Sequence, residues 1–236
     1  MRQYFVKEKL DLGVRTELSA EITHHLKNVL RRKSGDIIRL VDSEGRAFLA
    51  ELSVGESVSA AVVEQLETGN SQGKITCCAC LIKREKWEML IQKAAELGAD
   101  RIVPVISSRT IVHIGERELS RKLERWNKIA LEACQQSNRT EICTVERPIY
   151  LINISEYLSA NNLLAYENEE NAQLLDLCDE RDITIVTGPE GGFSSQEAEF
   201  LNSLGFASCS LGQRILRAET AVLYALAVID AKRNTL

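Results

Sequence analysis

The sequence of 236 residues lacks several features that would place it in common protein classes. No hydrophobic run reaches the roughly 18–20 residues that cross a bilayer. The first residues, Met1–Phe5, lack the apolar segment and the cleavage site of a signal peptide. Repeats and low-complexity tracts are also absent. These absences, with a composition of 44% hydrophobic and 27% charged residues, predict a cytoplasmic globular protein with no membrane partner.

A disulfide framework is also missing. The seven cysteines show no even spacing, and cytosolic thiols stay reduced. The spacing of Cys77, Cys78 and Cys80 matches none of the usual zinc-binding pairs. These residues belong to the apolar run Ile75–Ile82, which is typical of a buried strand. We therefore predict core cysteines and no metal site.

The net charge of −5 conceals two halves of opposite charge. Residues 74–128 contain 12 basic and 7 acidic side chains, whereas residues 140–199 contain 2 basic and 13 acidic ones. A further basic cluster surrounds Arg31. A mixed solvated surface would explain any one stretch, but this asymmetry favours a polyanionic partner that contacts one side only.

The pattern of apolar runs and turns predicts two domains, 1–72 and 73–236, with the boundary in the polar segment Thr68–Gly73. The first domain reads as mainly β, with strands Ile37–Val41, Ala47–Leu52 and Val58–Leu66 and one helix, Ala20–Leu30. Strands and helices alternate in the second, which indicates a mostly parallel α/β sheet. Its predicted strands are Ile75–Ile82, Arg101–Ile106, Leu163–Tyr166, Ile183–Thr187 and Ala207–Leu211, and its main helices are Lys86–Leu97, Glu116–Gln136 and Asn171–Cys178.

Two unusual loops occupy the last quarter of the chain. Gly188–Ser194 follows one predicted strand, and Leu211–Ala221 follows the next one about two dozen residues later. Because ligands in α/β sheets bind at the carboxyl ends of strands, this spacing predicts neighbouring strand ends that share one ligand. A tight turn without a ligand, or a helix cap with an ion pair at Arg217 and Glu219, is the alternative.

The first loop matches neither common phosphate-binding motif, because it lacks the Lys-Ser/Thr of a P-loop and the glycine spacing of a dinucleotide turn. Its glycines let backbone groups approach a ligand closely, which suits an adenine edge and a ribose. Elsewhere, Gln135 and Arg139 lie four residues apart at the end of a predicted helix. They could contact a base or a phosphate, or form an ordinary solvated helix end.

Five stretches together resemble one known family. They are Gly188–Ser194 with Glu197, Leu211–Ala221, Gln92–Pro104, Glu132–Arg139 and His24–Asp36. The chain resembles, over essentially its whole length, the RsmE family, which are 16S ribosomal RNA uridine-N3 methyltransferases of the SPOUT class. One departure lies at Glu141–Thr144, where family members commonly carry a proline.

The resemblance implies a fold and a set of partners. The fold would be a PUA-like β-barrel followed by a SPOUT-type α/β domain whose C-terminal part forms a trefoil knot. S-adenosylmethionine (S-adenosyl-L-methionine) would be the methyl donor, and 16S rRNA of the small ribosomal subunit would be the substrate of a homodimer. The donor-binding residues would be Leu164, Tyr166, Glu167, Thr187, Gly188, Pro189, Glu190, Gly191, Gly192, Leu211, Gly212, Ile215, Leu216 and Thr220.

The same resemblance supplies candidates for the chemistry. Arg139, Arg217 and Glu219 are the catalytic candidates, with the arginines holding the base or its phosphate. Glu190 and Glu219 are the available carboxylates, and the group that removes the N3 proton stays unassigned. The RNA-binding candidates are His25, Lys27, Arg31, Arg32 and Gln135.

Three other functions compete with this interpretation. Another SPOUT enzyme, acting on transfer RNA or on a ribose 2′-hydroxyl, would share the knot but not the first domain with its His24–Arg31 stretch. A non-catalytic RNA-binding protein of ribosome assembly could lose the donor loops, which are intact here. A nucleotide-phosphate-binding enzyme would be expected to carry the missing Lys-Ser/Thr.

Overall fold

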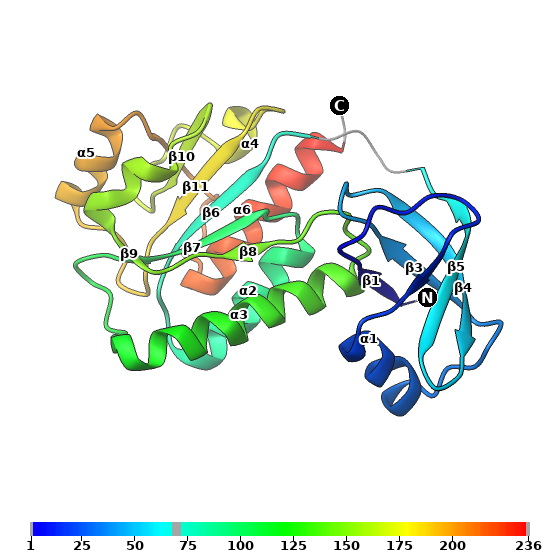
Figure 1. Cartoon of the computed structure of the whole chain (residues 1–236). Helices are drawn as coiled ribbons and strands as arrows, with labels where there is room; N and C mark the ends of the chain where they lie inside the picture. Colours follow the sequence, from blue (N-terminus) through cyan, green and yellow to red (C-terminus); the bar gives the residue numbers. More distant parts are fainter. Residues whose placement is uncertain (1, 68–71, 235–236) are drawn as a thin grey trace. The chain divides into compact units, whose positions relative to one another are not determined.

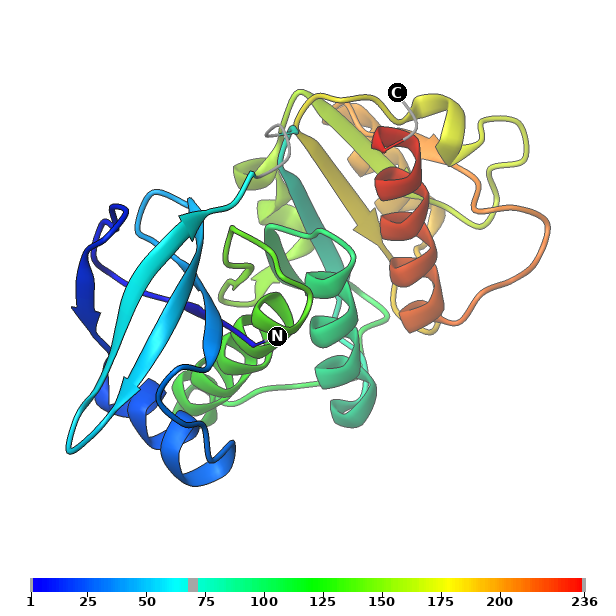
Figure 2. The ribbon, with the colours of Figure 1, turned by 90° about the vertical axis from the view of Figure 1, so that its right-hand side faces the viewer.

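The computed structural model describes residues 2–67 and 72–234, which form two compact units (Figure 1 and Figure 2). The first unit comprises Met1–Asn70 and Cys134–Glu141, and the second comprises Ser71–Ala133 and Ile142–Leu236. The predicted boundary segment Thr68–Gly73 lies mostly outside the described residues. The division at residue 72 therefore stays a prediction.

A five-stranded sheet with the order β1-β3-β4-β5-β2 forms the first unit. Its strands are β1 (Gln3–Phe5), β2 (Arg15–Glu17), β3 (Ile37–Val41), β4 (Ala47–Val54) and β5 (Val58–Gln65). β1 pairs with β3 in parallel, and all other neighbours are antiparallel. The three predicted strands are present. β1 and β2 were not predicted, because three residues are too few to show an alternating pattern.

The predicted helix Ala20–Leu30 is only partly α-helical. α1 (Ala20–His24) begins after Ser19, whose hydroxyl accepts a hydrogen bond from the Ile22 backbone N–H at 3.3 Å. It continues as a π-helical turn, η1 (His25–Val29), and the backbone then turns left-handed at Arg31. This wider turn places Leu26 in the core beside Ile38, Leu40 and Phe48.

A buried carboxylate organises one edge of the first unit. Asp42 accepts hydrogen bonds from the backbone N–H groups of Leu10, Glu44 and Arg46, and from the Arg46 guanidinium at 2.6 Å. Burial raises the pKa of Asp42, but these hydrogen bonds outweigh burial and hold the pKa below its usual value. Ionised Asp42 therefore stabilises the folded first unit.

We expect the first unit to lose stability as the pH falls through the lowered pKa of Asp42. The contribution is complete above the ordinary carboxyl pKa of about 4 and disappears in acid, because the protonated side chain accepts fewer hydrogen bonds. Amide hydrogen exchange in β3–β5 between pH 3 and 6, corrected for the intrinsic rate, measures this loss. Asp42→Asn should flatten the pH dependence, whereas Asp11→Asn, at a side chain that is 70% exposed, should retain it. Equal curves for the two variants would contradict this account.

A seven-stranded parallel sheet forms the second unit, with the order β12-β10-β11-β6-β7-β8 and with β9 also paired to β7. Its strands are β6 (Ile75–Cys80), β7 (Arg101–Ile106), β8 (Thr144–Val145), β9 (Ile149–Tyr150), β10 (Asn161–Ala165), β11 (Ile183–Thr187) and β12 (Ala207–Cys209). The predicted parallel α/β sheet is confirmed.

Helices cover both faces of this sheet. α2 (Arg84–Glu96) and α6 (Ala218–Arg233) lie side by side on one face (Figure 2). On the other face, the 3-10 helix η2 (Leu151–Tyr157) and α5 (Ser195–Ser203) pack over a core that contains Cys78, Cys80 and Val186. The remaining helices are α3 (Glu116–Gln136), which has its predicted bounds, and α4 (Leu174–Leu177).

Several predicted elements differ in detail. The predicted helix Asn171–Cys178 is reduced to the single turn α4, because Glu169 accepts hydrogen bonds from the Asn171 and Ala172 backbone N–H groups and holds that segment in a turn. The predicted strand Ala207–Leu211 ends at Cys209, after which Ser210 bridges only to Gln173. No periodic spacing of apolar residues in the sequence predicts the short strands β8 and β9 or the 3-10 helix η2.

The order of strands corrects one prediction about the two loops. They follow β11 and β12, which are not neighbours, because β10 lies between them. The registers place the carboxyl ends of all three strands together, with Ala165 opposite both Thr187 and Cys209. The shared end of the sheet therefore carries three loops instead of two.

The clustered cysteines are core residues, as predicted. Cys77, Cys78 and Cys80 are at most 2% exposed, and burial raises the pKa of Cys77 and of Cys80 to about 12. Among the described residues, no group of three potential ligands could hold a metal ion. None of the helices that the structure describes is long and apolar enough to cross a membrane.

Candidate functional site

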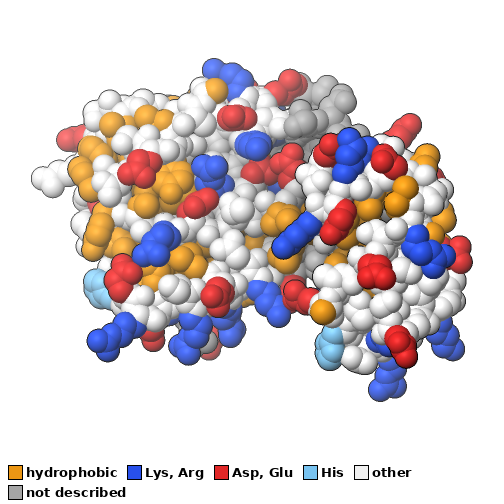
Figure 3. Space-filling model, viewed as in Figure 1, with side chains coloured by type: hydrophobic (Ala, Val, Ile, Leu, Met, Phe, Trp, Pro, Cys, Tyr) orange, Lys and Arg blue, Asp and Glu red, His pale blue; other side chains and the backbone are white. Residues whose placement is uncertain are grey.

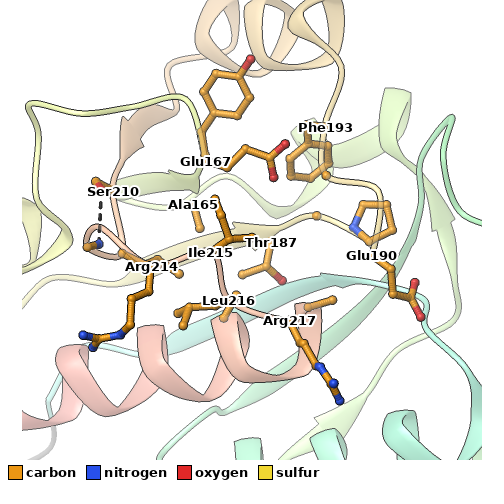
Figure 4. Close-up of a pocket in the computed structure, with 18 of the residues that line it drawn as sticks. Ala165, Glu167, Thr187, Glu190, Phe193, Ser210, Arg214, Ile215, Leu216 and Arg217 are labelled. Atoms are coloured by element: carbon orange, nitrogen blue, oxygen red, sulfur yellow. Dashed lines mark hydrogen bonds between the residues drawn. The ribbon is translucent and has the colours of Figure 1, made fainter.

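Three loops at the carboxyl end of the sheet enclose a pocket in the second unit (Figure 4). They follow β10, β11 and β12, and the pocket volume of about 390 Å³ suits a small molecule. Lys86 of α2 and the start of α6 complete the wall. The lining residues are Lys86, Ala165, Tyr166, Glu167, Thr187, Gly188, Pro189, Glu190, Gly192, Phe193, Ser210, Leu211, Gly212, Arg214, Ile215, Leu216, Arg217, Ala218 and Ala221.

The loop after β11 is shaped by its glycines. Gly192 closes a turn by donating its backbone N–H to the Pro189 carbonyl at 3.0 Å, and it adopts a left-handed conformation with φ of 64°. A Cβ atom on Gly192 would overlap the carboxylate of Glu167. The left-handed backbone therefore favours glycine here, and a Cβ atom would also displace the Glu167 carboxylate from its place in the pocket.

A capping box fixes the end of the same loop. Ser194 accepts a hydrogen bond from the Glu197 backbone N–H at 3.2 Å, and Glu197 accepts one from the Ser194 N–H at 2.9 Å. The second oxygen of Glu197 accepts from the Ser108 N–H at 2.8 Å, and Arg109 donates to the Gly191 carbonyl at 2.7 Å. The loop is thus held against the segment that follows β7.

The pocket presents groups suited to a ligand with both polar and charged parts. The hydroxyl of Thr187 is buried and has no hydrogen-bond partner among the described residues. The side chain of Ile215 is 84% exposed at the pocket, where it could cover an apolar surface. Charged side chains of both signs line the wall: Lys86, Arg214 and Arg217 are basic, and Glu167 and Glu190 are acidic.

Comparisons with known proteins agree with this architecture. The RNA methyltransferase domain family matches residues 69–230, and the RNA methyltransferase PUA domain family matches residues 18–62. Ribosomal RNA small subunit methyltransferase E of Bacillus subtilis is 33% identical, over 100% of this chain and 98% of the relative. The chain belongs to the ribosomal RNA small subunit methyltransferase E family.

Further relatives extend the agreement. The family member from Rickettsia conorii is 34% identical, over 95% of this chain and 93% of the relative. A crystal structure of the Neisseria gonorrhoeae member, bound to S-adenosyl methionine, is 32% identical with a TM-score of 0.87, over 98% of this chain and 97% of that one. The predicted fold class, a PUA-like domain followed by a SPOUT-type α/β domain, is confirmed. The trefoil knot stays a prediction.

Most of the predicted donor-binding residues of this family member line the pocket. The exceptions are Leu164, Gly191 and Thr220. Leu164 is fully buried in the sheet core, and Gly191 is engaged by Arg109. Thr220 lies on the first turn of α6 with its side chain exposed.

The three predicted catalytic residues are divided between the units. Arg217 lines the pocket and is the N-cap residue of α6. Glu219 lies two residues further, in the first turn of α6, and is 8% exposed, with its Oε1 atom 2.9 Å from Lys86 Nζ. Arg139 belongs to the first unit, where its carbonyl accepts a hydrogen bond from the Gln3 side chain at 2.5 Å.

The predicted RNA-binding residues all belong to the first unit. His25 is hydrogen-bonded to the Tyr4 hydroxyl at 3.0 Å, and Lys27 donates to the Gly55 carbonyl at 2.7 Å. Arg32 lies 3.6 Å from Asp36, and Arg31 is exposed. Gln135 lies in the last turn of α3. Nothing in these contacts assigns the residues a ligand, so their role stays a prediction.

Sequence reasoning missed two charged residues of the pocket. Arg214 lies within the recognised Leu211–Ala221 stretch, but no feature of the sequence singles it out from its neighbours there. Lys86 is one of several basic residues at the start of a predicted helix, and no sequence signal separates it from a solvated lysine. Its place in the wall follows from the packing of α2 against α6.

Proposed function

We propose that this protein transfers a methyl group from S-adenosylmethionine to N3 of a uridine in the 16S ribosomal RNA of the small subunit. Membership of the methyltransferase E family supports the reaction class and the RNA substrate. The observation that carries the proposal is the three-loop pocket, because a relative 32% identical to this chain binds S-adenosyl methionine.

The residues of the pocket fit this donor. The buried Thr187 hydroxyl and the glycine-rich backbone of Gly188–Gly192 suit the hydrogen-bonding edge of a nucleoside. Glu167 and Glu190 suit the positive charges of the donor, and Arg214 suits its carboxylate. S-adenosylmethionine supplies a methyl group that is already activated on a sulfonium. Neither a metal nor a redox cofactor is therefore part of the proposal.

The remaining work falls on the protein's own side chains. They must hold the uracil with N3 in line with the methyl group, and they must stabilise the charge that develops as the N3 proton leaves. Arg217 is at the pocket and is suited to either a carbonyl oxygen or a phosphate. We propose that Arg139, Gln135 and the basic side chains around Arg31 contact the RNA from the first unit.

The surface of the second unit supports an RNA partner. Lys and Arg side chains gather along the lower edge of this unit, over α3 (Figure 3). The sequence of that helix contains Arg117, Arg121, Lys122, Arg125 and Lys128. Phosphate contacts by such residues would offset the cost of a few kcal/mol for turning the target base out of a stack. We further propose a cytoplasmic homodimer, as the family resemblance implies.

The decisive experiment is methyl transfer from labelled S-adenosylmethionine to small ribosomal subunits that lack the modification. Mass analysis of the nucleosides should find 3-methyluridine at one position of the 16S RNA. Donor binding without transfer to these subunits would contradict the substrate while leaving the pocket intact. Transfer RNA and large subunits would then test the competing SPOUT activities, and a 2′-O-methyl product would identify the ribose enzyme.

A further inference from the structure

An ion pair between α2 and α6 fixes a lysine at the wall of the pocket. Lys86 lies in the first turn of α2, and its Nζ atom is 2.9 Å from Oε1 of Glu219 in the first turn of α6. The Glu219 side chain is 10% exposed, whereas that of Lys86 is 38% exposed and lines the pocket. The carboxylate is thus buried between the helices, and the ammonium reaches the cavity.

The burial of Glu219 is not explained by stability. Its second oxygen, Oε2, is buried without a hydrogen-bond partner among the described residues. Burying a carboxylate is costly, and a buried ion pair often stabilises a fold no better than apolar side chains of the same size. A second ion pair of α2, between Lys93 and Glu96, allows a comparison. It joins two residues of one helix, is more exposed than the Lys86–Glu219 pair and lies away from the pocket. A role of Lys86 and Glu219 at the pocket accounts for the deeper burial of Glu219.

Positive charge is concentrated where α6 begins. Lys86 and Arg217 both line this part of the wall, and the N-terminus of α6 adds its partial positive charge. The acidic Glu167 lies on the opposite side of the pocket, beside Phe193 (Figure 4). The wall near Glu167 is therefore suited to the cationic donor, and the basic side chains at the start of α6 are suited to an acceptor that becomes negative.

Glu219 is suited to position Lys86 and not to remove a proton. Burial raises the pKa of the Glu219 carboxyl, but hydrogen bonds from Lys86 and from its own backbone N–H, with the charges of Lys86 and Arg217, hold the pKa below its usual value. It therefore stays ionised and paired. This leaves the Lys86 ammonium with two N–H donors for a ligand.

We propose that Lys86, positioned by Glu219, donates a hydrogen bond to a carbonyl oxygen of the acceptor uracil. This inference rests on the proposed function. The N3–H bond breaks and its proton passes to solvent, and the negative charge left on N3 spreads to the carbonyl oxygens beside it. The N3–CH₃ bond then forms with an electron pair of N3 as the S–CH₃ bond breaks. The electron pair of the S–CH₃ bond remains on sulfur. Lys86 stabilises the uracil anion from which this attack occurs.

The test compares Lys86→Met with the unmodified protein in single-turnover methylation of small subunits at saturating donor. We expect a rate about 100-fold lower at neutral pH. The rate of the variant should keep rising to higher pH than that of the unmodified protein. Without the hydrogen bond from Lys86, the uracil loses its N3 proton only at higher pH. Donor affinity, measured by calorimetry without RNA, should be unchanged.

Three variants make the result specific. Lys93→Met removes a lysine of the same helix outside the pocket and should behave like the unmodified protein in every measurement. Lys86→Arg keeps a cation and should recover much of the rate, and Glu219→Gln should shift the pH profile in the same direction as Lys86→Met. Thermal unfolding checks that each variant is folded.

Two outcomes would overturn the proposal. A weaker donor affinity with a normal rate at saturating donor would assign Lys86 to the donor instead. A loss of rate that is the same at every pH would assign it a structural role. If the unmodified protein formed no 3-methyluridine, the proposed function would fail before Lys86 was tested.

Discussion

Gly192→Ala is expected to reduce the affinity for S-adenosylmethionine by about tenfold. The new Cβ atom would overlap the carboxylate of Glu167, and both residues line the pocket. The flexible end of the Glu167 side chain can relieve the overlap by moving out of its place in the pocket, and the left-handed backbone at residue 192 adds strain of about 1–2 kcal/mol. A factor of ten in affinity corresponds to about 1.4 kcal/mol. Calorimetric titration with the donor measures the change directly.

Gly205→Ala is a matched control for this substitution. Gly205 also has a left-handed backbone, with φ of 95°, but open space surrounds the position of its Cβ atom. This variant should lose about 1 kcal/mol of folding stability through backbone strain alone, and its donor affinity should stay normal. Normal donor affinity in Gly192→Ala would show that the contact between the two loops does not shape the donor site.

The positions of the site's strands along the chain could be predicted from the sequence, but their order in the sheet could not. Strand β11 and the glycine loop after it were predicted at the correct residues, because a run of β-branched, mostly apolar residues followed by glycines is a strong local signal. Sequence order made the loops after β11 and β12 appear to be neighbours. The insertion of β10 between these strands is a long-range pairing, and no local pattern encodes it.

The same distinction explains which site residues were found. Thr187 and Arg217 lie at the two unusual loops, and Glu167 was proposed from the family resemblance. All three line the pocket, and their roles stay predictions. Lys86 has an ordinary setting at the start of an amphipathic helix. It reaches the pocket only because α2 packs against α6, more than 130 residues later in the chain. A buried partner such as Glu219 is visible only once that packing is known.

Arg217→Ala is expected to reduce methyl transfer by about 10²–10³-fold while the protein stays folded. Its guanidinium lies at the pocket beside the first turn of α6, on the side opposite Glu167 (Figure 4). Removing one donor that stabilises developing charge has an effect of this size. Because the side chain is exposed, its loss should change folding stability by no more than about 0.5 kcal/mol. Rates at saturating donor and RNA, with thermal unfolding, measure both effects.

Two further variants separate the charge of Arg217 from its shape. Arg217→Lys keeps the positive charge but loses the planar fork of donors, so a partial rate would indicate that two oxygens are contacted at once. Arg147→Ala removes an arginine that is also exposed but lies outside the pocket and pairs with the surface residue Glu116. It should leave the rate unchanged. A normal rate in Arg217→Ala would remove this residue from the reaction and leave Lys86 as the cation that faces the acceptor beside the start of α6.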